Sequence, residues 1–296
     1  QAWPAGDSQR LIDKYELNQY ISTRQLALPA EEPDSNKSIS LFGDAAFTMD
    51  SVSMVKKMKG SEKVSNIYSS EVTRSSNRDA WISLPGTASE IKEIQTLFDK
   101  HKIKAVSYSQ QMATEEQFKT LSGSATAILH LATHGFFLPD PEKKRPGGFS
   151  AGENVFRLAD DPMLRSGIVL AGVNRVWSGL SPIEGREDGI ITAYEISQLD
   201  LRNTDLVVLS ACETALGDIK GNEGVFGLQR AFKLAGVKSM VLSLWKVPDK
   251  ETAELMKIFY KNYLEGNSAR EAFSMAQQEM RKRYSPYYWA AFVLIE

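Results

Sequence analysis

The chain has 296 residues, of which 42% are hydrophobic and 24% charged, as in ordinary soluble globular proteins. Its formal net charge of -2 excludes a broad basic surface for nucleic acid or an anionic membrane, and no apolar stretch approaches the ~20 residues of a membrane-spanning helix. The single cysteine, Cys212, excludes a disulfide framework within the chain, so we expect a reducing, cytoplasmic location. The chain begins with Gln1 rather than methionine, and we therefore expect it to be a fragment or a processed product.

The first eighty residues are less regular than the rest. Residues 38–44 have the pattern of a strand that ends in a turn, whereas residues 56–78 are rich in Ser, Lys and Asn and indicate a long surface connection. We therefore predict an N-terminal subdomain with its linker over residues 1–80 and a main subdomain over residues 81–296.

Strands and helices alternate after Trp81, which indicates an α/β fold with a parallel sheet. Capping-box patterns begin predicted helices at Thr87, Thr114 and Ser268. The other predicted helices cover 188–197, 224–235 and the residues after Asp249. The predicted strands cover 103–108, the run that ends at His134, the run that ends at Cys212, 237–245 and 289–295.

Two of these apolar runs each end at a reactive side chain. Residues 127–134 end in His134 followed by Gly135, and residues 206–212 end in Cys212. Because the carboxyl ends of parallel strands meet at one edge of a sheet, we expect the thiol and the imidazole to lie together. An imidazolium lowers the pKa of a neighbouring thiol and can protonate a leaving amine, so this pair predicts a cysteine peptidase. The amides of Gly135 and Cys212 are candidates for an oxyanion hole.

Other interpretations of these residues are weaker. A lone buried cysteine is usually an inert hydrophobe, and a lone histidine is usually structural. His130 and His134 are four residues apart, but on a strand that spacing spans about 13 Å, too far for a shared zinc ion. His130 is therefore expected to be a buried strand histidine behind the site. We find no serine-hydrolase elbow and no nucleotide-binding motif, and we expect no metal or other cofactor.

The residues around His134 and Cys212 resemble those of the CHAT domain, a bacterial branch of the caspase-like cysteine peptidases that also include separase. The matching segments occur in the order of that family and are LPGTASEIKEI, LHLATHGFF, DGIITAYEISQLDL, LVVLSACETALG, GNEGVFGLQRAF, VLSLWKVPD and YYWAAFVLIE. They cover roughly residues 81–296, whereas the first eighty residues resemble the degenerate N-terminal half of the family more loosely.

The resemblance implies a caspase-like three-layer sandwich, in which helices flank a mostly parallel sheet and a smaller degenerate half precedes it. It also implies His134 and Cys212 as the catalytic dyad, the Gly135 and Cys212 amides as the oxyanion hole, and endopeptidase activity on partner proteins. Members are often fused to tetratricopeptide repeats and act in bacterial defence or programmed cell death. We therefore expect an upstream repeat or regulatory region.

The candidates for the substrate pocket are Ser210, Glu223, Trp245 and Asp249. Caspases carry a glutamine two residues before the nucleophile, where this chain has Ser210, so an aspartate at the P1 position of the substrate is not expected. Separases place an acidic residue after the next strand, and Asp249 occupies a similar place, which favours a basic P1 residue. The alternative for Asp249 is a helix N-cap. The alternative for the whole chain is a catalytically silent scaffold.

Overall fold

In the computed structural model of this protein, the described residues are 37–49, 80–137, 161, 163–210, 223–245 and 247–296. Within them, a six-stranded sheet has the strand order β2-β1-β3-β7-β8-β9. Neighbouring strands are parallel except for the last pair, β8 and β9, which is antiparallel. The predicted parallel sheet is thus confirmed, with its final strand reversed. The strands are β1 (Ile39–Ala45), β2 (Ala105–Gln110), β3 (Ile128–Ala132), β7 (Leu206–Leu209), β8 (Ser239–Ser243) and β9 (Phe292–Ile295).

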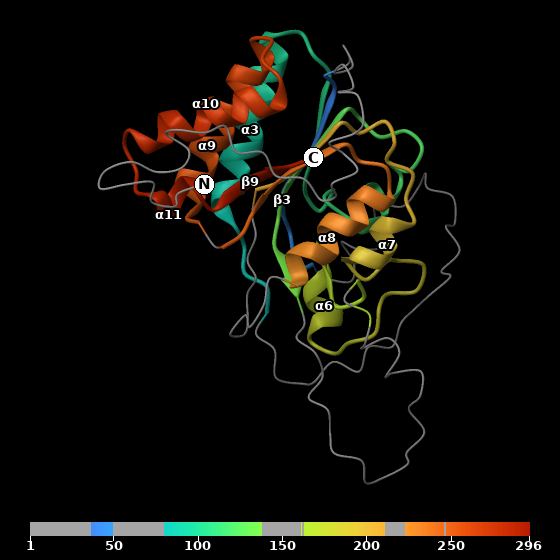
Figure 1. Cartoon of the computed structure of the whole chain (residues 1–296). Coiled ribbons are helices and arrows are strands. Elements are labelled where there is room, and N and C mark those ends of the chain that lie inside the picture. Colours follow the sequence, from blue (N-terminus) through green and yellow to red (C-terminus); the bar gives the residue numbers. More distant parts are fainter. Residues whose placement is uncertain (1–36, 50–79, 138–160, 162, 211–222, 246) are drawn as a thin grey trace.

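Helices cover both faces of this sheet (Figure 1). Alternate side chains of β3 explain the two layers, because Leu129 and Leu131 pack into one hydrophobic core and Ile128 and Ala132 into the other. The three-layer arrangement is consistent with the caspase-like fold. One layer contains α3 (Pro85–Lys100), α9 (Asp249–Leu264), α10 (Ala269–Arg281) and α11 (Pro286–Trp289), and the other contains α4 (Glu115–Lys119), α6 (Val173–Trp177), α7 (Ala193–Ser197) and α8 (Glu223–Leu234).

A second, three-stranded sheet follows His134 directly. It is antiparallel, has the order β4-β5-β6, and consists of β4 (Gly135–Phe137), β5 (Ser166–Val169) and β6 (Ile190–Thr192). Gly167 in its central strand is required by packing, since a Cβ there would lie 2.4 Å from the carbonyl oxygen of Ile191. The sequence did not predict this sheet, because its strands are only three or four residues long and two of them adjoin long loops.

The first eighty residues contribute a strand to the large sheet. β1 lies between β2 and β3 and pairs with both, so the sheet draws strands from both sides of the predicted boundary near residue 80. That division stays a prediction. Most of the predicted degenerate half and its linker lies outside the described residues.

The predicted helix starts are confirmed at two positions and corrected at three others. The helix predicted over 188–197 begins only at Ala193, because residues 190–192 form the strand β6 and Thr192 is the N-cap. Thr114 and Ser268 each accept a hydrogen bond from the backbone three residues later, as an N-cap does. α3, however, begins at Pro85 rather than at a capping box on Thr87, because Thr87 donates its hydroxyl to the carbonyl of Leu84. α9 is preceded by Pro248, and Asp249 is its first helical residue, so the interpretation of Asp249 as the N-cap is wrong.

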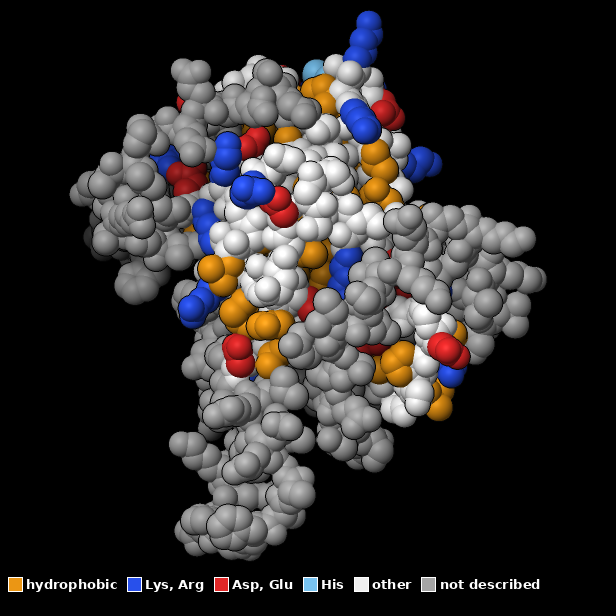
Figure 2. Space-filling model, turned by 90° about the vertical axis from the view of Figure 1, so that its right-hand side faces the viewer, with side chains coloured by type: hydrophobic (Ala, Val, Ile, Leu, Met, Phe, Trp, Pro, Cys, Tyr) orange, Lys and Arg blue, Asp and Glu red, His pale blue; other side chains and the backbone are white. Residues whose placement is uncertain are grey.

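The face that carries α7 and α8 shows hydrophobic side chains in small groups separated by polar ones (Figure 2). Tyr194 on α7 and Leu234 on α8 are exposed members of these elements, and scattered apolar residues of this kind are normal on a protein surface. Among the described residues, no helix is both long enough and apolar enough to cross a bilayer.

Candidate active site

The strands that lead to His134 and Cys212 are neighbours in the sheet. β3 and β7 are parallel and in register, and their last paired residues are Leu131 and Leu209. The backbone amide of Ser210 extends this contact with a 3.1 Å hydrogen bond to the carbonyl of Leu131. His134 stands three residues after Leu131 in the sequence, and Cys212 three residues after Leu209. Cys212 itself lies outside the described residues.

His134 is held in one orientation. Its side chain is 0% exposed, and its Nε2 donates a hydrogen bond to the carbonyl oxygen of Ile82 at 2.8 Å. A carbonyl only accepts hydrogen bonds, so this contact places the proton of the neutral imidazole on Nε2. In that tautomer Nδ1 carries the lone pair that can take a proton from a thiol.

Two aromatic rings flank the imidazole. The ring centroids of Phe47 and Trp81 each lie 5.1 Å from that of His134. Trp81 packs in turn against Trp177 of α6, with a centroid separation of 5.0 Å. Three segments that are far apart in the sequence therefore form the surroundings of the imidazole: the end of β1, the residues before α3, and α6.

Gly135 begins β4 and pairs with Ile168. A Cβ at this position would meet only ordinary van der Waals contact, with the carbonyl oxygen of Gly167 at 3.6 Å. Among the described residues, packing therefore does not demand a glycine here. The predicted role of its amide in an oxyanion hole stays a prediction.

The predicted pocket residues are spread along the carboxyl edge of the sheet. Ser210 follows β7 and is buried, whereas Trp245 follows β8 and is partly exposed, with its indole N–H donated to the carbonyl of Tyr287 at 2.9 Å. Asp249 begins α9 and faces the start of α3, where a Cβ on Gly86 would lie 2.7 Å from its Oδ2. Glu223 begins α8, but its side chain lies outside the described part of the structure.

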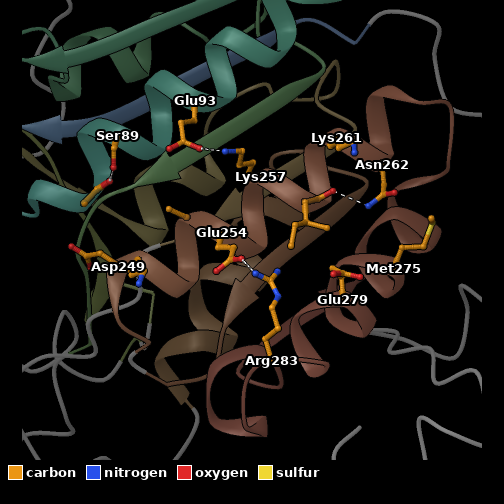
Figure 3. A pocket seen from close by; sticks show the side chains of 14 residues that line it. Ser89, Glu93, Asp249, Glu254, Lys257, Lys261, Asn262, Met275, Glu279 and Arg283 are labelled. Atoms are coloured by element: carbon orange, nitrogen blue, oxygen red, sulfur yellow. Dashed lines mark hydrogen bonds and ion pairs between the residues drawn. The ribbon is translucent and has the colours of Figure 1, made fainter.

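Asp249 lies at one end of a groove of about 880 Å³ between α3, α9 and α10, and Met275 lies at the other end (Figure 3). Gly86 also lines this groove and lies beside Asp249. Ion pairs cross or border this groove, including Lys257 with Glu93 at 2.9 Å. Gly86 is four residues from Ile82, whose carbonyl holds His134, and four residues span at most about 14 Å. The Asp249 end of the groove is thus the end near the segment that holds His134.

A second histidine, His130, is a buried strand residue, as the sequence predicted. It is 0% exposed on β3, and its ring nitrogens lie 3.1 Å from the hydroxyl of Tyr260 and 3.1 Å from Oε1 of Glu90. Burial raises the pKa of Tyr260 well above its usual value, with a smaller contribution from the carboxylate of Glu90. These contacts explain His130 as a structural residue that ties β3 to α3 and α9. Within the described residues, no group of His, Cys, Asp and Glu side chains is arranged to hold a metal ion.

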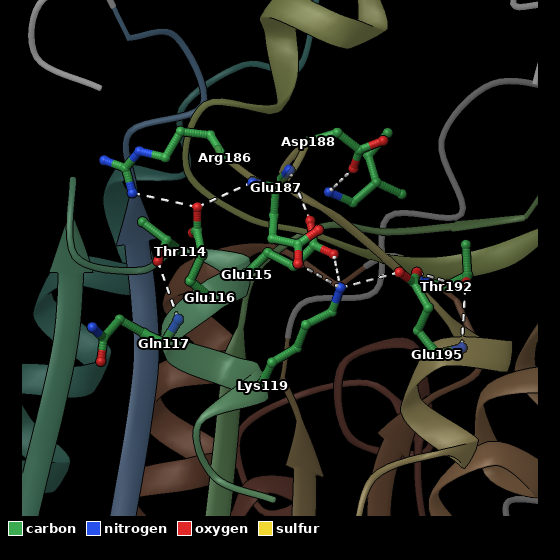
Figure 4. Close-up of polar contacts among 12 residues, drawn as sticks. Thr114, Glu115, Glu116, Gln117, Lys119, Arg186, Glu187, Asp188, Thr192 and Glu195 are labelled. Atoms are coloured by element: carbon green, nitrogen blue, oxygen red, sulfur yellow. Dashed lines mark hydrogen bonds and ion pairs between the residues drawn. The ribbon is translucent and has the colours of Figure 1, made fainter. Parts of the chain in front are cut away.

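A half-buried lysine, Lys119 of α4, organises a cluster of carboxylates that the sequence analysis missed (Figure 4). Its Nζ lies 2.8 Å from Glu115, 3.2 Å from Glu187 and 3.2 Å from Glu195. Glu115 also accepts a 2.9 Å hydrogen bond from the backbone of Gly189, the residue before β6. The cluster therefore fastens the three-stranded sheet to α4.

Ile82 and Asn174 are functional candidates that the sequence analysis also missed. Ile82 acts through its backbone carbonyl, which no residue type signals. Asn174 is buried on α6 and bonds to the backbone of Trp81 with both its oxygen and its nitrogen. The only hint in the sequence is a lone asparagine in the mostly apolar segment 167–177.

Comparison with known proteins adds a family and two partial relatives. A family model described as CHAT domain matches residues 1–296. Tetratricopeptide repeat protein 28 of Mus musculus is 34% identical over 110 residues, and Tetratricopeptide repeat protein 28 of Homo sapiens is 33% identical over 109 residues. Each match covers 36% of this chain and 4% of the relative, so the chain matches a small part of these much longer proteins.

Proposed function

Because the chain belongs to the CHAT domain family, we propose that it is a cysteine endopeptidase with Cys212 as nucleophile and His134 as general base and acid. The family belongs to the caspase-like cysteine peptidase superfamily. The observation that carries the proposal is the in-register pairing of β3 with β7. His134 and Cys212 each follow the last paired residue of their strand by three residues in the sequence. The bond from His134 to Ile82 supports it, because this bond orients the imidazole and fixes its tautomer.

The proposed reaction is acyl transfer followed by hydrolysis. The Cys212 sulfur gives its proton to Nδ1 of His134 and attacks the substrate carbonyl carbon, and the oxygen of that carbonyl becomes an oxyanion. The amides of Gly135 and Cys212 would stabilise this oxyanion. As the intermediate collapses, the C–N bond breaks, and His134 gives the proton to the departing amine. Water, deprotonated by the same imidazole, then hydrolyses the thioester and releases the acid product.

For the substrate, we propose a basic residue at P1, recognised by Asp249. Its carboxylate lies in the first turn of α9, at the end of the groove near the segment that holds His134, and it supplies the negative charge that Arg or Lys requires. Trp245, two residues after the end of β8, is the proposed apolar wall of the same pocket. Ser210 is buried, so its proposed contribution is through its backbone rather than its hydroxyl.

For the cellular role, we propose a cytoplasmic peptidase that works with a tetratricopeptide-repeat region and cuts partner proteins in bacterial defence or programmed cell death. The names of the two partial relatives support the link to such repeats. The single cysteine fits a reducing compartment.

The test of the proposed activity is cleavage of a peptide library by the wild type and by Cys212→Ala. We expect cleavage by the wild type and a loss of at least 10³-fold in kcat in the variant, because the nucleophile is gone. Retained cleavage in Cys212→Ala would remove Cys212 from the mechanism. If neither protein cleaves, and a thiol-reactive probe labels Cys212 no faster than a free thiol, the catalytically silent scaffold is the better account.

The test of the pocket is Asp249→Asn, which keeps the shape of the side chain and removes its charge. We expect kcat/KM for substrates with Arg or Lys at P1 to fall about tenfold to hundredfold, the worth of a hydrogen bond to a charged group. The matched control is Glu93→Gln, which removes another carboxylate from the same groove. Equal P1 preferences in the wild type and in Asp249→Asn would assign the pocket to other residues.

A further inference from the structure

We infer that Asn174 is a positioning residue for His134. This inference rests on the proposed function of the dyad but concerns a residue that does not touch the reacting atoms. Asn174 lies on α6 and is 8% exposed. Its hydrogen bonds go to the two segments whose aromatic rings flank the catalytic imidazole.

The first of these segments contains Trp81 and Ile82. The backbone N–H of Trp81 donates to Oδ1 of Asn174 at 2.8 Å, and Nδ2 of Asn174 donates to the carbonyl of Trp81 at 2.9 Å. Since an N–H must meet an oxygen and a carbonyl must meet an N–H, this pair of bonds also fixes the orientation of the amide. The carbonyl of the next residue, Ile82, accepts the hydrogen bond from Nε2 of His134. One peptide unit thus separates the Asn174 contact from the His134 contact.

The second segment follows β1. The backbone N–H of Asn174 donates to the carbonyl of Phe47 at 3.0 Å, and its Nδ2 also donates to the hydroxyl of Thr48 at 2.9 Å. Phe47 and Trp81 stand at equal centroid distances from His134, so Asn174 holds the backbone on both sides of the imidazole.

We expect these hydrogen bonds of Asn174 to fix the orientation of the His134 imidazole rather than to change how tightly the substrate binds. The segments around Phe47 and Trp81 are connecting segments between elements, and such segments move unless their backbone groups are paired. When the carbonyl of Ile82 is fixed, the imidazole keeps one orientation and the tautomer that leaves the lone pair on Nδ1. Displacements of about 1 Å at a catalytic group lower turnover by up to about 10²-fold.

The matched experiment compares Asn174→Leu with Gln277→Leu. Leucine approximates the shape of asparagine and removes the side-chain hydrogen bonds. Gln277 is a second buried amide, on α10, and its Nε2 donates to the carbonyls of Trp289 and Phe292, both at 3.0 Å. Both variants lose buried hydrogen bonds to backbone, but in the described structure only Asn174 bonds to the segments beside His134.

We expect Asn174→Leu to lower kcat about tenfold to hundredfold with KM changed less than about threefold, and Gln277→Leu to leave kcat within about twofold at the same folded fraction. Equal kcat losses in the two variants would assign Asn174 a merely structural role. Asn174→Leu also removes buried hydrogen bonds and can therefore lower the stability of the fold. Thr48→Val provides a milder test, because this exposed residue loses only its hydrogen bond to Asn174. We expect kcat of Thr48→Val to fall about threefold. An unchanged kcat in Thr48→Val would also contradict the inference.

A second readout needs no substrate. The chain has three histidines, so ¹⁵N NMR can follow each imidazole, and His134→Gln assigns the signals of His134. We expect the wild type to show the Nε2–H tautomer at His134 and Asn174→Leu to show a mixture of tautomers, with His130 unchanged. If the enzyme proves inactive but this shift occurs, the proposed peptidase function fails and the positioning role stands. If the wild type cleaves and the His134 signals do not move in Asn174→Leu, the positioning role fails alone.

Discussion

His134→Gln is expected to lower kcat for peptide cleavage by about 10²–10⁴-fold, with a much smaller change in KM. Glutamine removes the imidazole that takes and returns the proton, a function worth that range in rate. It keeps an N–H that can reach the carbonyl of Ile82, and it avoids the cavity that alanine would leave between Phe47 and Trp81. The loss should therefore report lost chemistry rather than unfolding.

The control is His101→Gln at the end of α3. His101 is exposed, and its Nδ1 lies 2.9 Å from the carbonyl of Leu97. His101 caps the C-terminal end of α3, whereas Ile82 lies before the N-terminal end of this 16-residue helix. We expect kcat within twofold of the wild type. A His134→Gln enzyme with kcat within about tenfold of the wild type would exclude His134 as the general base.

Lys119→Met is expected to destabilise the fold by about 3 kcal/mol at neutral pH. Glu115 is 2% exposed, and Lys119 provides its nearby positive charge, so the substitution leaves a buried carboxylate without its cation. The control is Lys257→Met, which removes an ion pair with Glu93 that is about half exposed and should cost less than about 1 kcal/mol. Denaturant unfolding of the three proteins at pH 7.5 gives these free energies, and equal values for both variants would contradict the account.

The pH dependence of this difference has a definite sign. Burial, followed by the charge of Asp188, raises the pKa of Glu115 well above its usual value of 4.5, and Lys119 opposes that shift. Without Lys119 the pKa rises further, so between pH 4.5 and that raised pKa the folded variant binds more protons than the unfolded chain. The stability of Lys119→Met therefore falls as the pH rises through this window.

In the wild type, burial by itself lowers the pKa of Lys119, but the carboxylates of Glu115, Glu195 and Glu187 outweigh it and raise the pKa above its usual value of 10.5. The stabilisation that Lys119 gains from these carboxylates is complete below pH 10.5, and it is lost only as the pH rises through the pKa of Lys119 in the folded state. The gap between wild type and Lys119→Met should accordingly be smaller at pH 5 than at pH 7.5. A gap that widens on acidification would contradict the described cluster.

The sequence was sufficient to predict the strands that carry the candidate dyad, because continuous apolar runs such as 206–209 are typical of strands buried on both faces. It also predicted that His134 and Cys212 would lie together, and the structure shows that the strands before them are neighbours in register. The start of α9 was harder to predict, since Asp249 and Pro248 both suit a helix N-terminus. Local pattern alone does not decide between them.

The contacts around His134 could not be predicted from the sequence, for a different reason. Ile82 contributes a carbonyl that every residue type has, and Asn174 is about ninety residues away from the Trp81 backbone that it binds. Such contacts depend on the packing of α6 against the segment before α3. The Lys119 cluster is similar, because its carboxylates come from α4, from the loop before β6 and from α7, and a charged residue in a sequence is usually solvated.

The most direct measurement is the rate of alkylation of Cys212 as a function of pH, in the wild type and in His134→Gln. The chain has one cysteine, so the mass of the intact protein reports that thiol alone. We expect the wild type to react faster than a free thiol below pH 8.5, the ordinary thiol pKa being about 8.5, and His134→Gln to lose this advantage. Identical profiles in the two proteins, both following an ordinary thiol, would show that His134 does not activate Cys212.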